Sequence, residues 1–550
     1  MKIKLTEKRK IIVLILLFIS AFLLRSEIYL FQSEFTSDQQ RFVVTAQQFL
    51  QGNGVSLTYA NPEDISESIA KPYPAAAEGY TYMLALFLKL TESVYFATAF
   101  LNILGVSFLF VAFFLLYKIF REKIPFTAVV AFLVLVGFGI RPYVFYSSTE
   151  IFSLAFYLLS IVVAMKVFDH KNTFLWCTLS AFFMFLTFWL RYAYLPMLVV
   201  VPTIWAFQWL ITKQKNYLKY IGVFAVSLFS FLIFSVVIKS YQESYLLTFG
   251  GGTAKASIFY PENLLSFNYA FALQAFIDDR FVFSILSRIG LALVAEPAKA
   301  IFTFVFTGII LWQLFLFLKE NLAEKNSNAS HFFLLAALFF GAALTLAMLV
   351  WFSFTKVAEM SNVQGYWTYV ASQRYFAVIY MAVFVLSFYF AFIFKKTPTF
   401  SKLIKYTLLL LALISVPYYF LSKMAEIKND KYYFEISENK AWYKAGITNM
   451  ETAQQLDSLI KNSFENGIRP VFITNTRLAF TAEMMTAEYG GSVLNNLEEM
   501  KTRKQVAVIL HLSENEINDN NSQIKIFCVK RNLLPILKDE TGEFYKFVMK

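Results

Sequence analysis

Charged residues are scarce in this sequence. Only 16% of its 550 residues are charged and 58% are hydrophobic, whereas an average soluble domain has about 25% charged residues. This composition excludes an ordinary soluble enzyme. The chain has only two cysteines and three histidines. Cys177 and Cys528 imply no disulfide, and the histidines lack the spacing of metal ligands.

Other signatures are missing as well. The three glycines at 250–252 have no Walker or Rossmann context, so they indicate no phosphate-binding loop. No repeat of fixed period stands out, although paired repeats are typical of transporters. The net charge of +12 could indicate a nucleic-acid binder, but the basic residues outside the C-terminal region lie mostly in short loops between apolar runs. That pattern is typical of cytoplasmic loops of a membrane protein, and we expect no nucleic acid as partner.

The sequence is rich in long apolar runs. A helix needs about 20 apolar residues to cross a bilayer, and the chain therefore predicts an α-helical polytopic membrane protein with about 11–13 transmembrane helices. Two shorter runs, 80–90 and 281–295, are either spans or interfacial segments. The longer blocks lie near 11–30, 94–117, 126–145, 150–167, 173–189, 194–211, 220–238, 299–318, 332–353, 375–394 and 404–420.

The basic residues predict the orientation. Every loop that would lie inside carries Lys or Arg if the N-terminus is cytoplasmic, and the apolar run at 11–30 is long and lacks a cleavage site, so we expect an uncleaved first span. The sequence thus predicts a membrane domain over 1–424, with a first outer loop at 31–78, and an extracytoplasmic domain over 425–550. The amino-acid usage favours a bacterial inner (plasma) membrane.

The C-terminal segment 425–550 reads as a small α/β domain. We expect helices near 450–464 and 477–488. Short β-branched or apolar runs at 469–475, 504–512 and 523–530 predict strands. Alternating helices and strands of this kind are typical of a small α/β fold.

The first outer loop holds the leading candidate for chemistry. Its start predicts an amphipathic helix from Ser37 that ends at Gly52 and Gly54, with Asp38, Phe42 and Ala46 on one face. A carboxylate at that place can act as a general base toward an acceptor hydroxyl or bind a divalent cation. It can equally serve only as a helix cap.

A family resemblance rests on the order of several motifs. After the Asp38 helix come Lys-Pro-Tyr-Pro, from Lys71, and an apolar helix from Glu78. This order resembles the GT-C superfamily of integral-membrane glycosyltransferases, in particular the protein O-mannosyltransferases and the lipid A aminoarabinose transferases. Three further positions are similar to family features: the pair Thr149 and Glu150 opening a span, the basic turn at Arg191, and the pair Arg374 and Tyr375 at the mouth of a late span.

The resemblance implies an inverting glycosyltransferase. Its donor would be a polyprenyl-phosphate sugar and its acceptor a hydroxyl of a glycan, lipid or protein on the outer face. Asp38 would be the catalytic base. Arg374 and Lys71 would bind the donor phosphate, because a guanidinium forks onto two phosphate oxygens. Glu150, Arg191 and Glu78 would bind substrate or supply a second acid.

Several alternatives stay open at this stage. Many relatives carry a second acid where this chain has Gln39, so metal dependence is undecided, with Mg²⁺ or Mn²⁺ as the candidate cofactor. Glu150 could instead cap its helix or pair with Arg141 or Arg191, and cations at span ends often only set helix depth. Other functions that fit are a transporter, a lipid-linked polysaccharide polymerase or ligase, and a non-catalytic scaffold.

Overall fold

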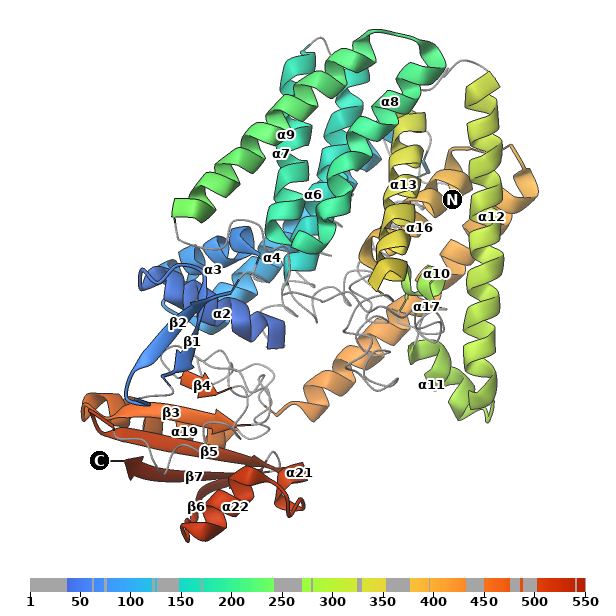
Figure 1. Ribbon diagram of the computed structural model, residues 1–550. Coiled ribbons are helices and arrows are strands. Elements are labelled where there is room, and N and C mark those ends of the chain that lie inside the picture. The colour runs from blue at the N-terminus through green and yellow to red at the C-terminus, as the bar shows by residue number, and fades with distance from the viewer. Residues whose placement is uncertain are drawn as a thin grey trace. The chain divides into compact units, whose positions relative to one another are not determined.

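In the computed structural model the chain forms two compact units (Figure 1). One comprises 1–27, 104–237 and 250–430; the other comprises 28–103, 238–249 and 431–550. The described residues are 37–61, 64–73, 77–120, 124–125, 148–169, 172–241, 270–277, 280–323, 329–352, 376–394, 396–431, 450–474, 485–487, 502–539 and 542–549.

The first unit is built from long apolar helices, as the sequence predicts. Their bounds are α4 (Val94–Phe120), α6 (Ser148–Met165), α7 (Thr173–Leu190), α8 (Val200–Thr212), α9 (Asn216–Tyr241), α10 (Phe271–Gln274), α11 (Arg280–Arg288), α12 (Ala295–Ala323), α13 (Ala329–Phe352), α16 (Ala377–Phe392) and α17 (Pro398–Asn429), with short 3₁₀ helices η1 (Lys166–Phe168), η2 (Tyr192–Val199) and η4 (Ala292–Val294). Residues 94–103 and 238–241, the ends of two of these helices, belong to the second unit.

Among the described residues, seven helices are long and apolar enough to cross a membrane. They coincide with seven of the eight blocks predicted between 94 and 353. The eighth block, 126–145, lies outside the described residues, as does the block at 11–30. The block at 375–394 forms α16, which is shorter, and 404–420 lies within α17. The two undecided runs form a helix, α3, at Glu78–Thr91, and the short pieces α11 and η4.

Helix α16 is the core of the first unit, since all of its residues are buried. Aromatic rings pack it against neighbours, for example Phe384 against Phe113 at a centroid distance of 5.6 Å. Helices α6 and α7 are held side by side by Ser160, whose hydroxyl donates to the Ser180 carbonyl at 2.8 Å. A polar pair of this kind satisfies both groups where no water is available.

The second unit begins with α2 (Ser37–Leu50), the predicted loop helix. Gly52 and Gly54 follow it with φ of 86° and 66°, a conformation that glycine adopts readily, and so end the helix as expected. A hairpin then forms from β1 (Ser56–Ala60) and β2 (Ser68–Pro72), which pair antiparallel. This hairpin was not predicted from the sequence. Helix α3 follows it and packs against α2.

The C-terminal part of this unit is a small α/β domain, as predicted. Its five-stranded sheet has the order β4-β3-β5-β7-β6, in which β4–β3–β5 are parallel and β5–β7–β6 antiparallel. The elements are α19 (Met450–Glu465), β3 (Arg469–Thr474), β4 (Met485–Ala487), β5 (Val506–Ser513), α21 (Glu514–Ile517), α22 (Gln523–Lys530), β6 (Pro535–Asp539) and β7 (Gly542–Met549).

Both faces of this sheet are covered. Every residue of the central strand β5 is buried, as a strand covered on both faces requires. On one face Phe472, Ile509 and Phe544 pack against α19. On the other face Val471, Ile473 and Val508 form a cluster with residues of α22 and with Ile65, which lies in the predicted first outer loop.

Two predictions for this domain are wrong. Residues 523–530 form helix α22 instead of a strand: Ser522 caps it by accepting from the Lys525 N–H, and Ile524, Phe527 and Cys528 are buried at helical spacing. The expected helix at 477–488 is contradicted in its described part, because 485–487 form strand β4, paired with β3. Sheet pairing overrides the helix propensity of this stretch there.

Candidate functional site

Asp38 is the second residue of α2, as the sequence predicts, and its side chain lies outside the described residues. Phe42 and Ala46, one and two turns further on, are buried. The helix face that carries Phe42 and Ala46 therefore turns toward the interior of the unit. This fixes the orientation of α2 around its own axis.

Helix α3 is the element that α2 packs against. The rings of Phe42 and Tyr80 meet edge to face at a centroid distance of 4.9 Å, and the hydroxyls of Thr45 and Thr81 lie 3.4 Å apart. Glu78, the candidate acid, is the first residue of α3 and is buried. A carboxylate in the first turn is stabilised by the positive end of the helix dipole.

Lys71 lies in strand β2, opposite Leu57 of β1. Its side chain is outside the described residues, as is the whole of Arg374. Asp38, Lys71 and Glu78 thus belong to one compact unit. Their roles in catalysis and phosphate binding stay predictions.

Glu150 and Arg191 form an ion pair in the first unit. Glu150 lies in the first turn of α6 and Arg191 follows the last residue of α7. Arg191 Nη2 lies 2.8 Å from Glu150 Oε1. The Thr149 hydroxyl donates to Glu150 Oε2 at 2.7 Å and accepts from Arg191 Nη1 at 3.2 Å. Of the two partners that the sequence allowed for Glu150, Arg191 is in contact, and Arg141 lies outside the described residues.

The pair is shielded from water. The Glu150 side chain is fully buried and only 13% of the Arg191 side chain is exposed. Removing one partner from such a pair leaves a buried charge uncompensated, which costs about 3–5 kcal/mol. The pair therefore fixes the turn after α7 to the start of α6. An arginine that is neutralised in this way is a weaker phosphate ligand than a free one.

The described residues contain no group of three or more His, Cys, Asp or Glu side chains that could hold a metal ion. Gln39, which stands where many relatives of the resembled family have a second acid, is buried in α2. His331 donates to or accepts from the Tyr389 hydroxyl at 2.8 Å, and His511 lies in strand β5. A metal site therefore stays a prediction that depends on residues outside this part of the chain.

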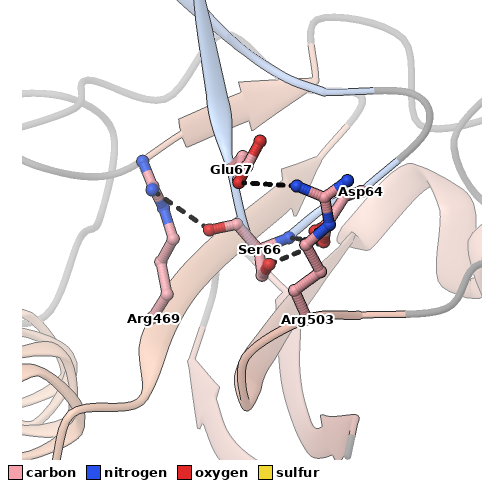
Figure 2. A network of polar contacts seen from close by, with 5 residues as sticks. All are labelled: Asp64, Ser66, Glu67, Arg469 and Arg503. Atoms are coloured by element: carbon pink, nitrogen blue, oxygen red, sulfur yellow. Dashed lines mark hydrogen bonds and ion pairs between the residues drawn. The ribbon is translucent and has the colours of Figure 1, made fainter.

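A polar network that the sequence analysis missed joins the first outer loop to the C-terminal domain (Figure 2). The Ser66 hydroxyl and backbone N–H donate to Asp64 Oδ1 at 2.6 and 2.9 Å. Arg469 Nη1 donates to the Ser66 carbonyl at 3.1 Å. Arg503 lies 3.7 Å from Asp64 Oδ2 and 3.6 Å from Glu67 Oε1.

The two arginines come from the same edge of the sheet. Arg469 opens β3, and Arg503 lies shortly before β5, which is parallel to β3. The amino ends of parallel strands meet at one edge. The Asp-x-Ser sequence at 64–66 is a local signal for a tight turn here. Its partners lie some four hundred positions away, and no sequence pattern links them.

Charge effects in this network follow from its hydrogen bonds. The hydroxyl of Ser66 is the main cause that lowers the pKa of Asp64; the Ser66 backbone N–H and Arg503 act in the same direction. Burial lowers the pKa of Arg469, against the opposite effect of Glu67. The Arg503 side chain is 79% exposed, and ion pairs that exposed contribute little to stability.

The apolar contact outweighs these exposed ion pairs. Ile65 is fully buried in the cluster formed by β3, β5 and α22. Burying an Ile side chain completely is worth about 1.5–3 kcal/mol. Ile65 therefore contributes most to holding the loop in place. The two arginines orient the loop through their contacts with Asp64, Ser66 and Glu67. Because the loop and the domain share one core, we expect both on the same side of a membrane.

Comparison with known proteins gives a similarity in overall structure. No model of a protein family and no curated protein sequence matches the chain. Two solved structures of ArnT from Cupriavidus metallidurans, a lipid A aminoarabinose transferase, are similar to this chain. Each alignment covers 97% of this chain and 97% of the ArnT chain, at 10% sequence identity. The TM-score is 0.42 for the apo state and 0.40 for the state bound to undecaprenyl phosphate. A likeness at this level assigns neither a reaction nor a site residue to this chain.

Proposed function

We propose that this membrane protein is an inverting glycosyltransferase. It takes a sugar from a polyprenyl-phosphate lipid and transfers it to a hydroxyl of a glycan, lipid or protein on the extracytoplasmic face. The observation that carries the proposal is the construction of the first outer loop. An acid-bearing helix is ordered by packing against α3 and is joined, through the hairpin, to a folded C-terminal domain.

This construction suits transfer from a lipid donor. A polyprenyl tail needs apolar helices to lie against, and at least seven helices of the described chain are long enough to cross a bilayer. The reacting phosphate lies at headgroup depth, where outer loops can reach it. A carboxylate on a rigid helix at that level can remove the proton from an acceptor hydroxyl.

The proposed chemistry is a single in-line displacement at the anomeric carbon. Asp38 accepts the proton of the acceptor hydroxyl as its oxygen bonds to that carbon. The bond to the lipid phosphate breaks, and the phosphate leaves with the electron pair. Arg374 and Lys71 stabilise the charge on the departing phosphate. If Mg²⁺ or Mn²⁺ takes part, it would supply further stabilisation of that same charge.

Glu150 and Arg191 receive a supporting role in this proposal. Their ion pair compensates both charges, so they hold α6 and the turn after α7 in place. Glu78 is buried at the start of α3 and orients the helix that α2 packs against. Glu150, Arg191 and Glu78 become candidates for a substrate ligand or an acid in catalysis only if Asp38 proves dispensable.

The test uses purified full-length protein and a panel of polyprenyl-phosphate sugars with membrane extract as acceptor source. Release of free polyprenyl phosphate, dependent on the protein, supports the proposal. Transport of a solute in proteoliposomes without donor consumption would identify a transporter. Growth of a polymer on a lipid-linked glycan would identify a polymerase or ligase.

A further inference from the structure

The C-terminal domain holds the first outer loop through residues 64–67, which we name the loop seat. Resting on the function proposed above, we propose that Ile65 and Arg469 are positioning residues. By fixing the loop seat, they set the place of helix α2 and therefore of Asp38. The C-terminal domain then takes part in turnover without contacting the substrate.

The first step is the dependence of the seat on the completed domain. Ile65 is fully buried in a cluster whose other side chains come mainly from β3, β5, β7 and α22. Neither the loop nor the domain can cover these surfaces alone. The loop therefore takes its place only when the sheet and α22 are folded, and it leaves that place only by exposing apolar surface.

Polar contacts orient the backbone of the loop seat. Arg469 is rigidly placed, because its backbone N–H donates to the Gln505 carbonyl at 3.1 Å between β3 and the approach to β5. Its guanidinium donates to the Ser66 carbonyl at 3.1 Å. Asp64 closes the turn on the Ser66 N–H and hydroxyl. These bonds fix the backbone on both sides of Ile65.

The third step is transmission along the hairpin. The loop seat connects β1 to β2, and the two strands pair over their full length from Ser56↔Pro72 to Ala60↔Ser68. The pairing extends beyond the strands, since the Tyr73 N–H donates to the Val55 carbonyl at 3.0 Å. Figure 1 shows this hairpin running between the five-stranded sheet and helices α2 and α3.

The last step joins the hairpin to α2. At its far end, Arg41 Nη1 donates to the Tyr73 hydroxyl at 3.3 Å, and the Arg41 guanidinium lies 5.9 Å from the centre of the Tyr73 ring. The Asn53 side chain donates to Gln48 Oε1 at 2.8 Å. Arg41 is one helical turn after Asp38. The residue that follows β2 thus contacts α2 near its start, and the connection that leads into β1 contacts α2 near its end.

Loss of the seat should impair the chemical step more than donor binding. A displacement of about 1 Å at a reacting group lowers turnover by about 100-fold. We therefore expect Ile65→Ala to lower kcat by about 10- to 100-fold, while the KM for the donor changes far less. Ile65→Val, which loses one methylene group, should restore most of kcat.

The experiment measures turnover and amide hydrogen exchange of the full-length protein in nanodiscs. Ile65→Ala and Arg469→Met are compared with Ile526→Ala, a change of an apolar side chain on α22 that is 52% exposed and outside the buried cluster. Both seat variants should exchange faster in 56–72 and in α2. The control should match the wild type in exchange and in turnover.

Strand β5 serves as the internal check of folding. If the amides of β5 lose protection in Ile65→Ala, that substitution has unfolded part of the domain. The Arg469→Met variant then decides whether the loop seat positions α2. Faster exchange in 56–72 with unchanged exchange in α2 overturns the proposal, because the seat then acts on the loop alone. Faster exchange in α2 with unchanged kcat overturns it as well.

The exchange measurement needs no substrate, so the two proposals can fail separately. If the wild type consumes no polyprenyl-phosphate sugar, the proposed function fails. The response of α2 to Ile65→Ala still shows whether the domain positions the helix, and an unresponsive α2 rejects the inference even in an active transferase.

Discussion

The guanidinium of Arg191 lies 2.8 Å from a carboxylate oxygen of the fully buried Glu150, and Thr149 bonds to both. Residues from the start of one apolar helix and the end of the next are thus tied by a compensated charge. Because each charge is stable there only beside the other, the pair has consequences for stability that differ from those of an exposed pair.

Breaking this pair from one side should be more harmful than removing it. We expect Glu150→Gln and Arg191→Met each to destabilise the protein by about 3–5 kcal/mol, because a buried charge is left uncompensated. The double variant should be less destabilised than the sum of the two. Thermal unfolding of the four proteins in detergent measures this, and simple additivity would show that the pair is not coupled.

The approach of α13 to α6 depends on Gly341. A Cβ at this position would overlap the hydroxyl of Tyr157, which donates to the Ala337 carbonyl at 3.0 Å. Gly341→Ala should therefore cost about 1–3 kcal/mol by overpacking, and Tyr157→Phe should recover part of that loss. Gly308→Ala is the matched control, since nothing lies within 4 Å of its Cβ. Equal melting temperatures of the two glycine variants would contradict the close contact.

The pH dependence of the loop seat follows from Asp64, whose pKa in the folded protein is below the ordinary 3.8. Since folding lowers this pKa, the stabilisation by the ionised group is complete above about pH 4 and is lost as the pH falls through the lowered pKa. Protease cleavage of 53–72 should be faster in Asp64→Asn than in the wild type at neutral pH. The difference should vanish in strong acid, and a difference that vanished near neutrality would reject this role of Asp64.

The topology can be tested by labelling with a thiol reagent that does not cross membranes. Single cysteines at Asn61 and Asn520 should react from outside, whereas one at Lys215, in a predicted inner loop, should be protected. The background is low, because both native cysteines are buried and burial raises the pKa of Cys528 to about 12. Since the loop and the C-terminal domain share one core, opposite results at Asn61 and Asn520 would contradict the structure itself.

Local patterns predicted those parts of the fold that local chemistry decides. The helix from Ser37 to the glycines at 52 and 54, and most of the long apolar helices, follow from periodicity, length and turn residues. The stretch 523–530 misled because its short apolar run also fits a strand; the cap at Ser522 and the helical spacing of Ile524, Phe527 and Cys528 decide it.

The candidate site divides in the same way. Asp38 and Glu78 were recognisable as acids at helix starts, and the choice of Arg191 as partner of Glu150 was one of two that the sequence allowed. The burial of Ile65 against the sheet and the bond from Arg469 to the Ser66 carbonyl were not predictable, because both depend on contacts between segments far apart in the chain. Only the folded sheet brings them together.

The central claim is that Asp38 acts as the base of a sugar transfer, and Asp38→Asn tests it most directly. Asparagine has nearly the size of aspartate, and position 38 is the second residue of α2. The substitution removes only a favourable charge in the first turn, worth about 0.3–1 kcal/mol, so the protein should fold with a melting temperature close to that of the wild type. Turnover with the polyprenyl-phosphate donor should fall by about 100-fold or more. Arg374→Lys, which keeps the charge but loses the bidentate fork, should mainly weaken donor use. A well-folded Asp38→Asn protein with full activity would contradict the account and direct the search to Glu150 and the acids at Glu63, Asp64 and Glu67.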